Sequence, residues 1–297
     1  MEIVDAHAHV YERLAGFGPR GEGRAVGGGV MEWATGEREQ FLRPEDGDLG
    51  FSYDRLVERM DEAGISRAVL LQCCNYGFAN GYVAEAVTAY PDRFLGVGVL
   101  DPFCGRAADI FRHLTETKGF SAVKLDLSER FGLVGYHPEL AVDGEVCEFL
   151  FSLAEERGVP VTLDTGPLGT RSLDPEAIAR VLDRHPRLTL VLAHALFPSP
   201  TDGRNGERLA ILRSLAGADL YVDTASLAID TPAVQAYLRA ATDLLGVDRV
   251  MFGTDVPGAL KARSYATMVD AVRPLFSTEE LPLVLGQNAL RVYGKRL

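Results

Sequence analysis

The chain has 297 residues, of which 47% are apolar and 24% are charged, and its formal net charge is −12. This composition is typical of a globular protein with a large core, and the acidic balance disfavours binding to nucleic acid or to an acidic membrane. No apolar run in the sequence reaches the roughly 18 residues that span a bilayer.

The ends of the chain and its cysteines bear on where the protein works. The N-terminus has no basic region followed by an apolar stretch, so we expect no signal peptide. Cys73, Cys74, Cys104 and Cys147 show no C-x-x-C spacing. We therefore interpret all four as reduced thiols in a cytoplasmic protein.

Short apolar runs rich in β-forming residues recur along the chain, with amphipathic stretches between them. The predicted strands cover residues 2–7, 67–73, 94–100, 120–127, 159–165, 188–194, 218–224 and 249–255, and helices are predicted for 53–63, 143–157, 174–185 and 231–245. Gly64, Gly158 and Gly246 follow three of these helices, as expected of helix ends. Eightfold alternation of strand and helix predicts an α/β fold, a (β/α)8 TIM barrel. The alternative, an open doubly wound sheet, lacks a G-x-G-x-x-G turn after any strand.

Two segments depart from the alternation. Residues 11–50 form a long, glycine-rich insertion after the first strand, and 278–297 form an extra C-terminal helix with no strand after it. Because a 40-residue connection is long for a loop, we interpret it as an active-site cover loop and not as a second domain. With no internal repeat or linker, residues 1–297 are predicted to be a single domain.

The first predicted strand contains two histidines in the stretch "IVDAHAHV". Side chains two apart in a strand point to the same side, so His7 and His9 would project together, about 7 Å apart along the backbone. Two neutral imidazoles that converge in this way suit a metal ion such as zinc. The alternative is a pair of histidines satisfied by ordinary hydrogen bonds at a strand end.

Three further metal-compatible side chains fall at the C-terminal ends of predicted strands, where barrel active sites are built. Asp164 ends the fifth strand, His194 the sixth and Asp255 the eighth. For the sixth strand we expect Leu190 and Leu192 to face inward with His194. So many polar groups at one barrel mouth are hard to explain as packing, and they predict a metal site.

Several motifs resemble the amidohydrolase superfamily. "DAHAHV", "LAHALF", "MFGTDVPG" and the closing "GQNALRVYG" look like its amidohydrolase-related branch, as do "MDEAGISRAVLLQ" and "AVTAYPDRFLGVGVLDP". This branch includes aminocarboxymuconate-semialdehyde decarboxylase, aromatic acid decarboxylases and dicarboxylate lactonases. The resemblance covers nearly the whole chain and implies the barrel fold, but it does not specify the substrate.

By position, the resemblance makes His7 and His9 metal ligands of the first strand and Asp255 a ligand that also moves protons. It makes His194 either a ligand or the group that polarises the substrate carbonyl. Asp164 departs from the family pattern, in which histidine commonly ends the fifth strand. As a harder, anionic ligand, Asp164 would favour manganese or iron over zinc; alternatively it does not bind the metal.

Two groups of residues near the predicted mouth have competing interpretations. Lys124 could be carboxylated and bridge two metals, as in other amidohydrolases, or it could form an ion pair with Asp126 or Asp164. In the loop after the fourth strand, Arg130, Tyr136 and His137 could meet an anionic substrate, or the loop could simply be solvated.

We expect a metal-dependent hydrolase of a small cyclic ester or amide, with one divalent ion, zinc in the first instance. Asp255 would act as general base and acid, and His194 would polarise the carbonyl. A non-oxidative decarboxylase of an aromatic or unsaturated acid, built on the same site, is the alternative, and a catalytically inactive binding protein is a third hypothesis. The expected partners are a small substrate, which could be anionic, and a second copy of the chain in a homodimer.

Overall fold

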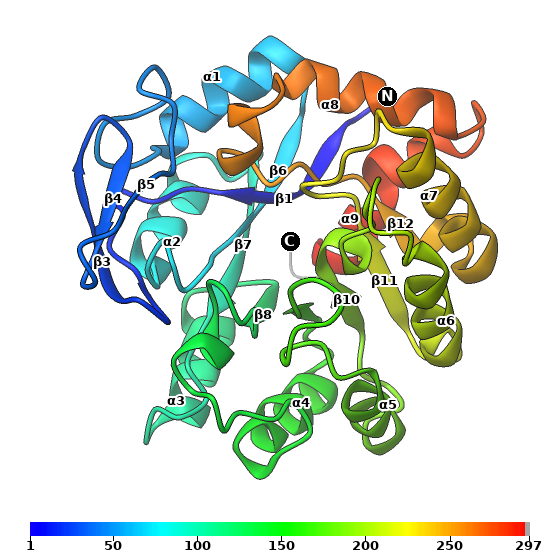
Figure 1. Ribbon diagram of the computed structural model, residues 1–297, viewed down its shortest axis with the longest axis horizontal. Coiled ribbons are helices and arrows are strands. Elements are labelled where there is room, and N and C mark those ends of the chain that lie inside the picture. Colours follow the sequence, from blue (N-terminus) through cyan, green and yellow to red (C-terminus); the bar gives the residue numbers. More distant parts are fainter. Residues whose placement is uncertain (295–297) are drawn as a thin grey trace.

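The computed structural model describes residues 1–294 and contains an eight-stranded parallel sheet. Neighbouring strands pair in the order of the chain, and Figure 1 shows them curving around a common centre. Backbone hydrogen bonds from Ala6 to Phe252 and from His9 to Val256 close the barrel between its first and last strands. The strands are β1 (Val4–His9), β6 (Arg67–Leu71), β7 (Phe94–Val99), β8 (Ala122–Asp126), β9 (Val161–Asp164), β10 (Leu190–Leu192), β11 (Leu220–Asp223) and β12 (Val250–Met251).

Helices lie outside the strands, as the alternating pattern predicts, and the TIM-barrel prediction is confirmed. Ser52 and Asp174 cap the N-termini of two helices by accepting backbone N–H groups, and Gly64 and Gly158 end two helices in the left-handed conformation. The helices are α1 (Tyr53–Ala63), α2 (Asn80–Ala89), α3 (Ala107–Arg112), α4 (Glu145–Arg157), α5 (Pro175–Arg184), α6 (Asn205–Leu215), α7 (Pro232–Leu245), α8 (Tyr265–Val272) and α9 (Asn288–Tyr293).

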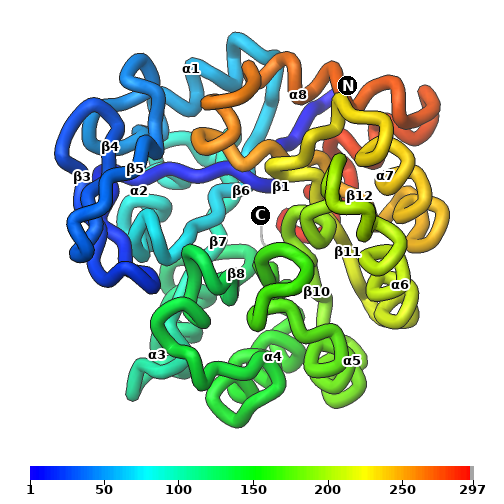
Figure 2. The backbone as a smooth tube through the Cα atoms, viewed as in Figure 1, coloured from blue at the N-terminus to red at the C-terminus, as the bar shows by residue number. Residues whose placement is uncertain are grey.

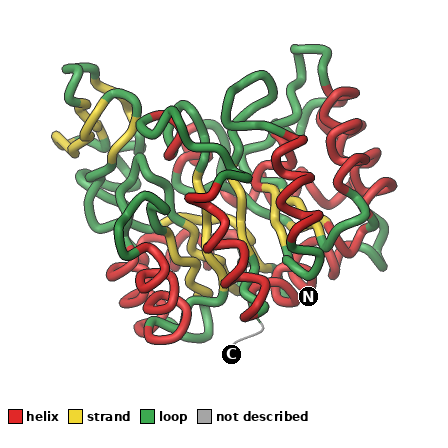
Figure 3. The backbone as a smooth tube through the Cα atoms, turned by 90° about the horizontal axis from the view of Figure 1, so that it is seen from below, coloured by secondary structure: helices red, strands yellow, loops and turns green. Residues whose placement is uncertain are grey.

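The insertion after β1 contains regular structure that the sequence pattern did not predict. It folds into a four-stranded antiparallel sheet of β2 (Phe17–Gly18), β3 (Gly21–Gly27), β4 (Val30–Trp33) and β5 (Arg38–Gln40). Figure 2 shows the chain leaving β1 for this sheet and returning to α1, and in Figure 3 the sheet stands at the upper left, away from the N-terminus. Its strands are short and rich in glycine, so they lack the long apolar alternation that marks a strand.

The lower part of the barrel interior, toward the N-terminal ends of the strands, is apolar and is closed by α9. Buried side chains of α9, among them Val292 and Tyr293, belong to one apolar cluster with residues from every barrel strand except β9. From β9, Thr162 meets Tyr293 with its hydroxyl oxygen 2.8 Å from the tyrosine oxygen. The predicted C-terminal helix therefore forms the floor of the barrel, although residues 295–297 of its predicted range lie outside the described residues.

The expectation for the sixth strand is wrong in its side-chain direction. Leu190 and Leu192 of β10 belong to the helix-facing core, and Val191 belongs to the barrel interior together with Met251. Val191 also pairs in register with Thr162, which points inward. His194 still reaches the interior because β10 ends at Leu192 and the backbone then changes direction.

Among the described residues, no helix has both the length and the apolar character needed to cross a membrane.

Candidate active site

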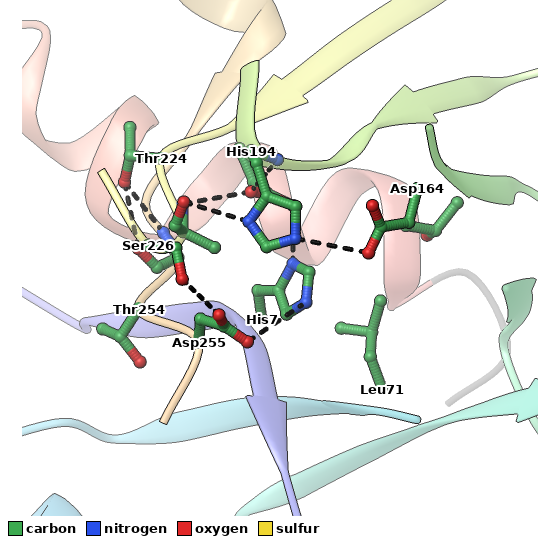
Figure 4. A network of polar contacts seen from close by, with 12 residues as sticks. His7, Leu71, Asp164, His194, Thr224, Ser226, Thr254 and Asp255 are labelled. Atoms are coloured by element: carbon green, nitrogen blue, oxygen red, sulfur yellow. Dashed lines mark hydrogen bonds and ion pairs between the residues drawn. The ribbon is translucent and has the colours of Figure 1, made fainter. Parts of the chain in front are cut away.

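His7 and His9 of β1 both point into the upper end of the barrel, at the C-terminal ends of the strands. The Nδ1 of His7 lies 3.0 Å from Oδ2 of Asp223, and the Nδ1 of His9 lies 2.9 Å from the carbonyl oxygen of Leu71. With Nδ1–H donating to Asp223, the His7 ring presents the lone pair of its Nε2 to the interior. On that side Oδ1 of Asp255 lies 2.9 Å from His9 Nε2 and 3.9 Å from His7 Nε2. Figure 4 shows Asp255 beside His7 and below His194.

The chemistry of this cluster fits a divalent metal ion. One ligand atom each from His7, His9 and Asp255 lies within 4.8 Å of the other two. The Nε2 of His7 is fully buried and has no hydrogen-bond partner, an arrangement that is costly unless another group occupies its lone pair. Burial also lowers the pKa of His7 to about 4, against the effect of Asp223. His7 is therefore neutral, as a metal ligand has to be, and Asp223 fixes its tautomer.

A second group of three, His7, His194 and Asp223, also has ligand atoms within 4.8 Å of one another. Its polar atoms already bind one another, because Asp223 accepts hydrogen bonds from His7 Nδ1 through one oxygen and from the backbone N–H of His194 through the other. These hydrogen bonds fix the positions of His7 and His194. We therefore assign the metal-compatible position to His7, His9 and Asp255.

Asp164 and His194 form a separate charged group with Lys124. Oδ2 of Asp164 lies 3.2 Å from Lys124 Nζ and 3.4 Å from His194 Nε2. Burial acts to lower the pKa of His194, but the carboxylates of Asp164, Asp255 and Asp223 together outweigh it and raise that pKa to about 9. Its Nδ1 lies 3.1 Å from the carbonyl oxygen of Ala225, so both ring nitrogens have partners, and the role of His194 as a metal ligand remains a prediction.

Of the two ion pairs expected for Lys124, the structure forms the one with Asp164. Burial acts to lower the pKa of Lys124, whereas the neighbouring Cys73, Asp164 and Asp126 hold it well above its ordinary value. The same lysine and His194 hold the pKa of Asp164 well below its ordinary value, against the effect of burial. Asp164 thus faces two cations, and its role as a metal ligand remains a prediction.

The backbone that carries His194 is strained. His194, Ala195, Leu196 and Phe197 have φ angles of 60°, 44°, 62° and 52°, which places four consecutive residues other than glycine in the left-handed region. Each such residue costs roughly 1–2 kcal/mol. Asp255 is also left-handed, with φ of 68°. Strain of this kind persists only where surrounding contacts impose it, and it commonly marks functional sites.

A cavity of about 650 Å³ opens above these residues. Asp164, His194 and Asp255 contribute to its lining, and the insertion contributes Glu39 and Phe41. The predicted covering role of the insertion remains a prediction, but its last strand and the residue that follows do lie at the cavity. The other apolar and aromatic lining residues include Tyr76, Phe131, Phe197, Leu227, Ile229 and Met268.

One cationic side chain at the cavity has few partners. Arg130 is 74% exposed, stacks on the ring of Phe131 at 4.6 Å and approaches Glu39 only at 3.7 Å. His137, predicted beside it, instead pairs with Asp101 at 2.9 Å and is not among the cavity-lining residues. Tyr136 is likewise not among them, so Arg130 is the member of the predicted trio that a substrate could meet.

Sequence reasoning missed three residues of the site. Asp223 ends the predicted strand 218–224 just as Asp164 ends its own, and that signal could have identified it. Ser226 donates a hydrogen bond to Oδ2 of Asp255, and no sequence signal marks it. Cys73 lines the cavity with its Sγ 3.5 Å from Lys124 Nζ and 3.9 Å from Nε2 of His9. The adjacent-cysteine pattern alone does not show which thiol faces inward.

The metal-compatible cluster lies at the C-terminal ends of the parallel barrel strands, which is where TIM-barrel enzymes have their active sites. The chain belongs to the amidohydrolase family, whose sequence profile matches residues 4–295. The expected family membership is therefore confirmed. No curated protein matches the sequence.

Solved structures share the fold at low sequence identity. A probable 2-pyrone-4,6-dicarboxylic acid hydrolase from Acinetobacter baumannii is 18% identical, with a TM-score of 0.70 over 99% of this chain and 100% of that chain. An amidohydrolase from Burkholderia multivorans with bound zinc is 18% identical, with a TM-score of 0.72 over 99% of both chains. The 5-carboxyvanillate decarboxylase of Sphingomonas paucimobilis is 19% identical, with a TM-score of 0.59 over 80% of this chain and 82% of that chain. Family membership identifies the protein as an enzyme of a group that contains hydrolases and decarboxylases.

Proposed function

We propose that the protein is a metal-dependent hydrolase that opens a small cyclic ester or amide. The observation that carries this proposal is the position of Asp255, whose Oδ1 lies 2.9 Å from His9 Nε2 while the residue itself lines the cavity. A base beside a metal-compatible pair of imidazoles and open to substrate is what hydrolysis needs.

A divalent cation held by His7, His9 and Asp255 would supply Lewis-acid chemistry toward a water molecule and the substrate's carbonyl. Zinc is the first candidate, because two imidazoles and one carboxylate are a common catalytic set for it. Manganese or iron becomes the better candidate if Asp164 also binds. The bound-zinc structure of the Burkholderia relative supports the choice of zinc.

Asp255 is suited to accept a proton from the attacking water. Burial acts to raise its pKa, but the hydrogen bond with His9 and the nearby rings of His194 and His7 hold that pKa well below its ordinary value. The carboxylate is therefore ionised at neutral pH. Ser226 donates a hydrogen bond to Oδ2, Oδ1 lies beside the Nε2 atoms of His9 and His7, and the residue lines the cavity. After ring opening, Asp255 would return the proton to the leaving oxygen or nitrogen.

His194 is suited to stabilise negative charge on the substrate's carbonyl oxygen. Its pKa is raised to about 9, so its ring is protonated at neutral pH, and it lines the same cavity as Asp255. A preorganised N–H donor that faces a developing oxyanion commonly contributes a factor of about 10² to 10³ in rate.

The substrate we propose is small and carries a carboxylate. A cavity of about 650 Å³ with aromatic walls suits a flat ring. Arg130 offers an exposed guanidinium above Phe131, a group that binds carboxylates bidentately. The Acinetobacter relative is described as a dicarboxylic acid hydrolase and holds citric acid, which supports an anionic substrate.

Decarboxylation of an aromatic acid is the second candidate. Its support is the similarity of the fold to 5-carboxyvanillate decarboxylase and to the 2,6-dihydroxybenzoate decarboxylase of Rhizobium, each over about 80% of this chain. In that reaction the same site would orient the carboxylate and no water would attack.

Metal analysis of the purified protein, followed by assays on cyclic esters, cyclic amides and aromatic acids with and without a carboxylate, tests both candidates. We expect about one equivalent of a divalent metal and ring opening of carboxylated lactones. Release of CO₂ from aromatic acids without any lactone hydrolysis would replace the first candidate by the second. Arg130→Ala should raise KM for carboxylated substrates and leave neutral ones unaffected.

A further inference from the structure

The left-handed turn of residues 194–197 connects β10 to the active site. It directs His194 toward Asp164 and places Phe197 in the cavity wall. The rings of His194 and Phe197 stack with their centroids 4.2 Å apart. Glycine populates this backbone region readily, whereas none of these four residues is glycine. Something outside the turn has to hold it in this conformation.

Two side chains from the neighbouring helices α6 and α7 bind the carbonyl groups of this turn. The Tyr237 hydroxyl of α7 donates to the carbonyl oxygen of Ala195 at 2.7 Å, and Nε of Arg208 on α6 donates to that of Leu196 at 3.1 Å. Tyr237 and Arg208 are each 2% exposed. The two helices lie side by side on the flank of the barrel behind β10 and β11, as Figure 1 shows.

The guanidinium of Arg208 is itself fixed in place. It donates to both carboxylate oxygens of Asp202, at 2.6 and 3.1 Å, and lies 3.3 Å from the side-chain oxygen of Asn205. These contacts restrict rotation of the planar guanidinium, so the Nε of Arg208 stays directed toward the turn. A lysine could keep the charge opposite Asp202 but could not reproduce that geometry.

We propose that Tyr237 and Arg208 are positioning residues that hold residues 194–197 in the left-handed conformation and so set the direction of His194 and Phe197. As far as activity is concerned, this inference rests on the proposed hydrolase function. Neither residue is among those that line the cavity, so they act through the turn and not on the substrate.

Tyr237→Phe tests the inference, because it removes one hydroxyl and little else. Tyr293→Phe is a matched control: Tyr293 is also a buried tyrosine whose hydroxyl has a close partner, Thr162, but at the opposite end of the barrel. We expect both variants to lower the melting temperature. Only Tyr237→Phe should reduce kcat/KM, by about tenfold, since a misdirected His194 no longer meets the carbonyl oxygen. Arg208→Lys should reduce kcat/KM in the same direction.

A rescue separates positioning from general destabilisation. Ala195→Gly removes the steric cost of the left-handed conformation at the residue whose carbonyl Tyr237 binds. We expect the double variant Tyr237→Phe/Ala195→Gly to recover kcat/KM to within about twofold of Ala195→Gly alone. A defect that persists in the double variant would overturn the inference, as would equal losses of activity in Tyr237→Phe and Tyr293→Phe.

A spectroscopic readout makes the test independent of substrate. In protein labelled with carbon-13 histidine, the ring signal of His194, assigned by its loss in His194→Asn, should move in Tyr237→Phe and stay in place in Tyr293→Phe. It should return in the double variant. If the wild type opens none of the cyclic substrates, the proposed hydrolase function fails while these spectra still decide the positioning role. An unmoved His194 signal in Tyr237→Phe contradicts the positioning role.

Discussion

The two ends of the barrel interior are built on different principles. At the lower end, apolar side chains such as Val97, Val191 and Met251 pack around α9 in regular strands. At the upper end, His7, His194 and Asp255 lie among charges, and the last two belong to left-handed backbone. The lower end therefore contributes stability, while the upper end holds strain and buried charge that only function explains.

The strongest test of this contrast is the removal of the imidazole pair. In His7→Ala/His9→Ala the metal-compatible cluster loses two of its three ligands, so we expect metal content to fall to background and activity to fall by about 10⁴-fold or more. The fold should remain, because the strands keep their pairing. Mass spectrometry of bound metal and circular dichroism measure the two expectations, and full metal content in the double variant would refute the cluster as we draw it.

Asp255→Asn should act on chemistry more than on binding. The amide keeps the shape but cannot take a proton, and it is a weaker metal ligand, so in samples with matched metal content kcat should fall by about 10²- to 10⁴-fold with little change in KM. Steady-state kinetics on a hydrolysed lactone provide the measurement. A drop of less than threefold in kcat would exclude Asp255 as the base.

Asp164→Asn distinguishes a metal ligand from a partner of Lys124. Because Asp164 lies 3.2 Å from Lys124 Nζ, its loss leaves a buried ammonium unpaired, and we expect the free energy of unfolding to fall by about 3–5 kcal/mol. Metal affinity should stay within a few fold of wild type. Thermal unfolding and metal titration of the same sample decide the matter, since weakened metal binding at unchanged stability would make Asp164 a ligand after all.

Val97→Ala probes the lower end with the smallest expected effect. Removing two methyl groups from a fully buried position should cost about 2 kcal/mol of unfolding free energy. Kinetic constants should be unchanged, because the residue lies in the apolar layer below the site. Chemical denaturation and kinetic assays run in parallel check this, and a clear loss of kcat would show that the two ends are coupled.

The sequence predicted the regular parts of the molecule well. All eight barrel strands fall within or overlap their predicted ranges, and the predicted helix 53–63 matches α1. The reason is physical: buried parallel strands and amphipathic helices each leave a periodic apolar pattern. The same regularity placed His7 and His9 on one side of β1, where the structure has them.

What escaped prediction depends on contacts between distant segments. No glycine marks the left-handed turn at 194–197, because its conformation is imposed by helices that come later in the chain. The ion pair of Asp164 with Lys124, by contrast, was one of the two alternatives that the sequence offered. Asp223 was within reach of prediction, since it ends a strand like the other acidic residues of the site.

The helical floor closes the barrel at the end opposite the active site. The active-site cavity lies at the other end, where Phe41, Arg130 and Lys261 are among its lining residues. A substrate would therefore enter, and a product leave, on that side of the barrel. If the protein opens cyclic esters as proposed, its product would carry a new carboxylate and would leave past the same Arg130 guanidinium that binds the substrate, so accumulated product would compete with fresh substrate.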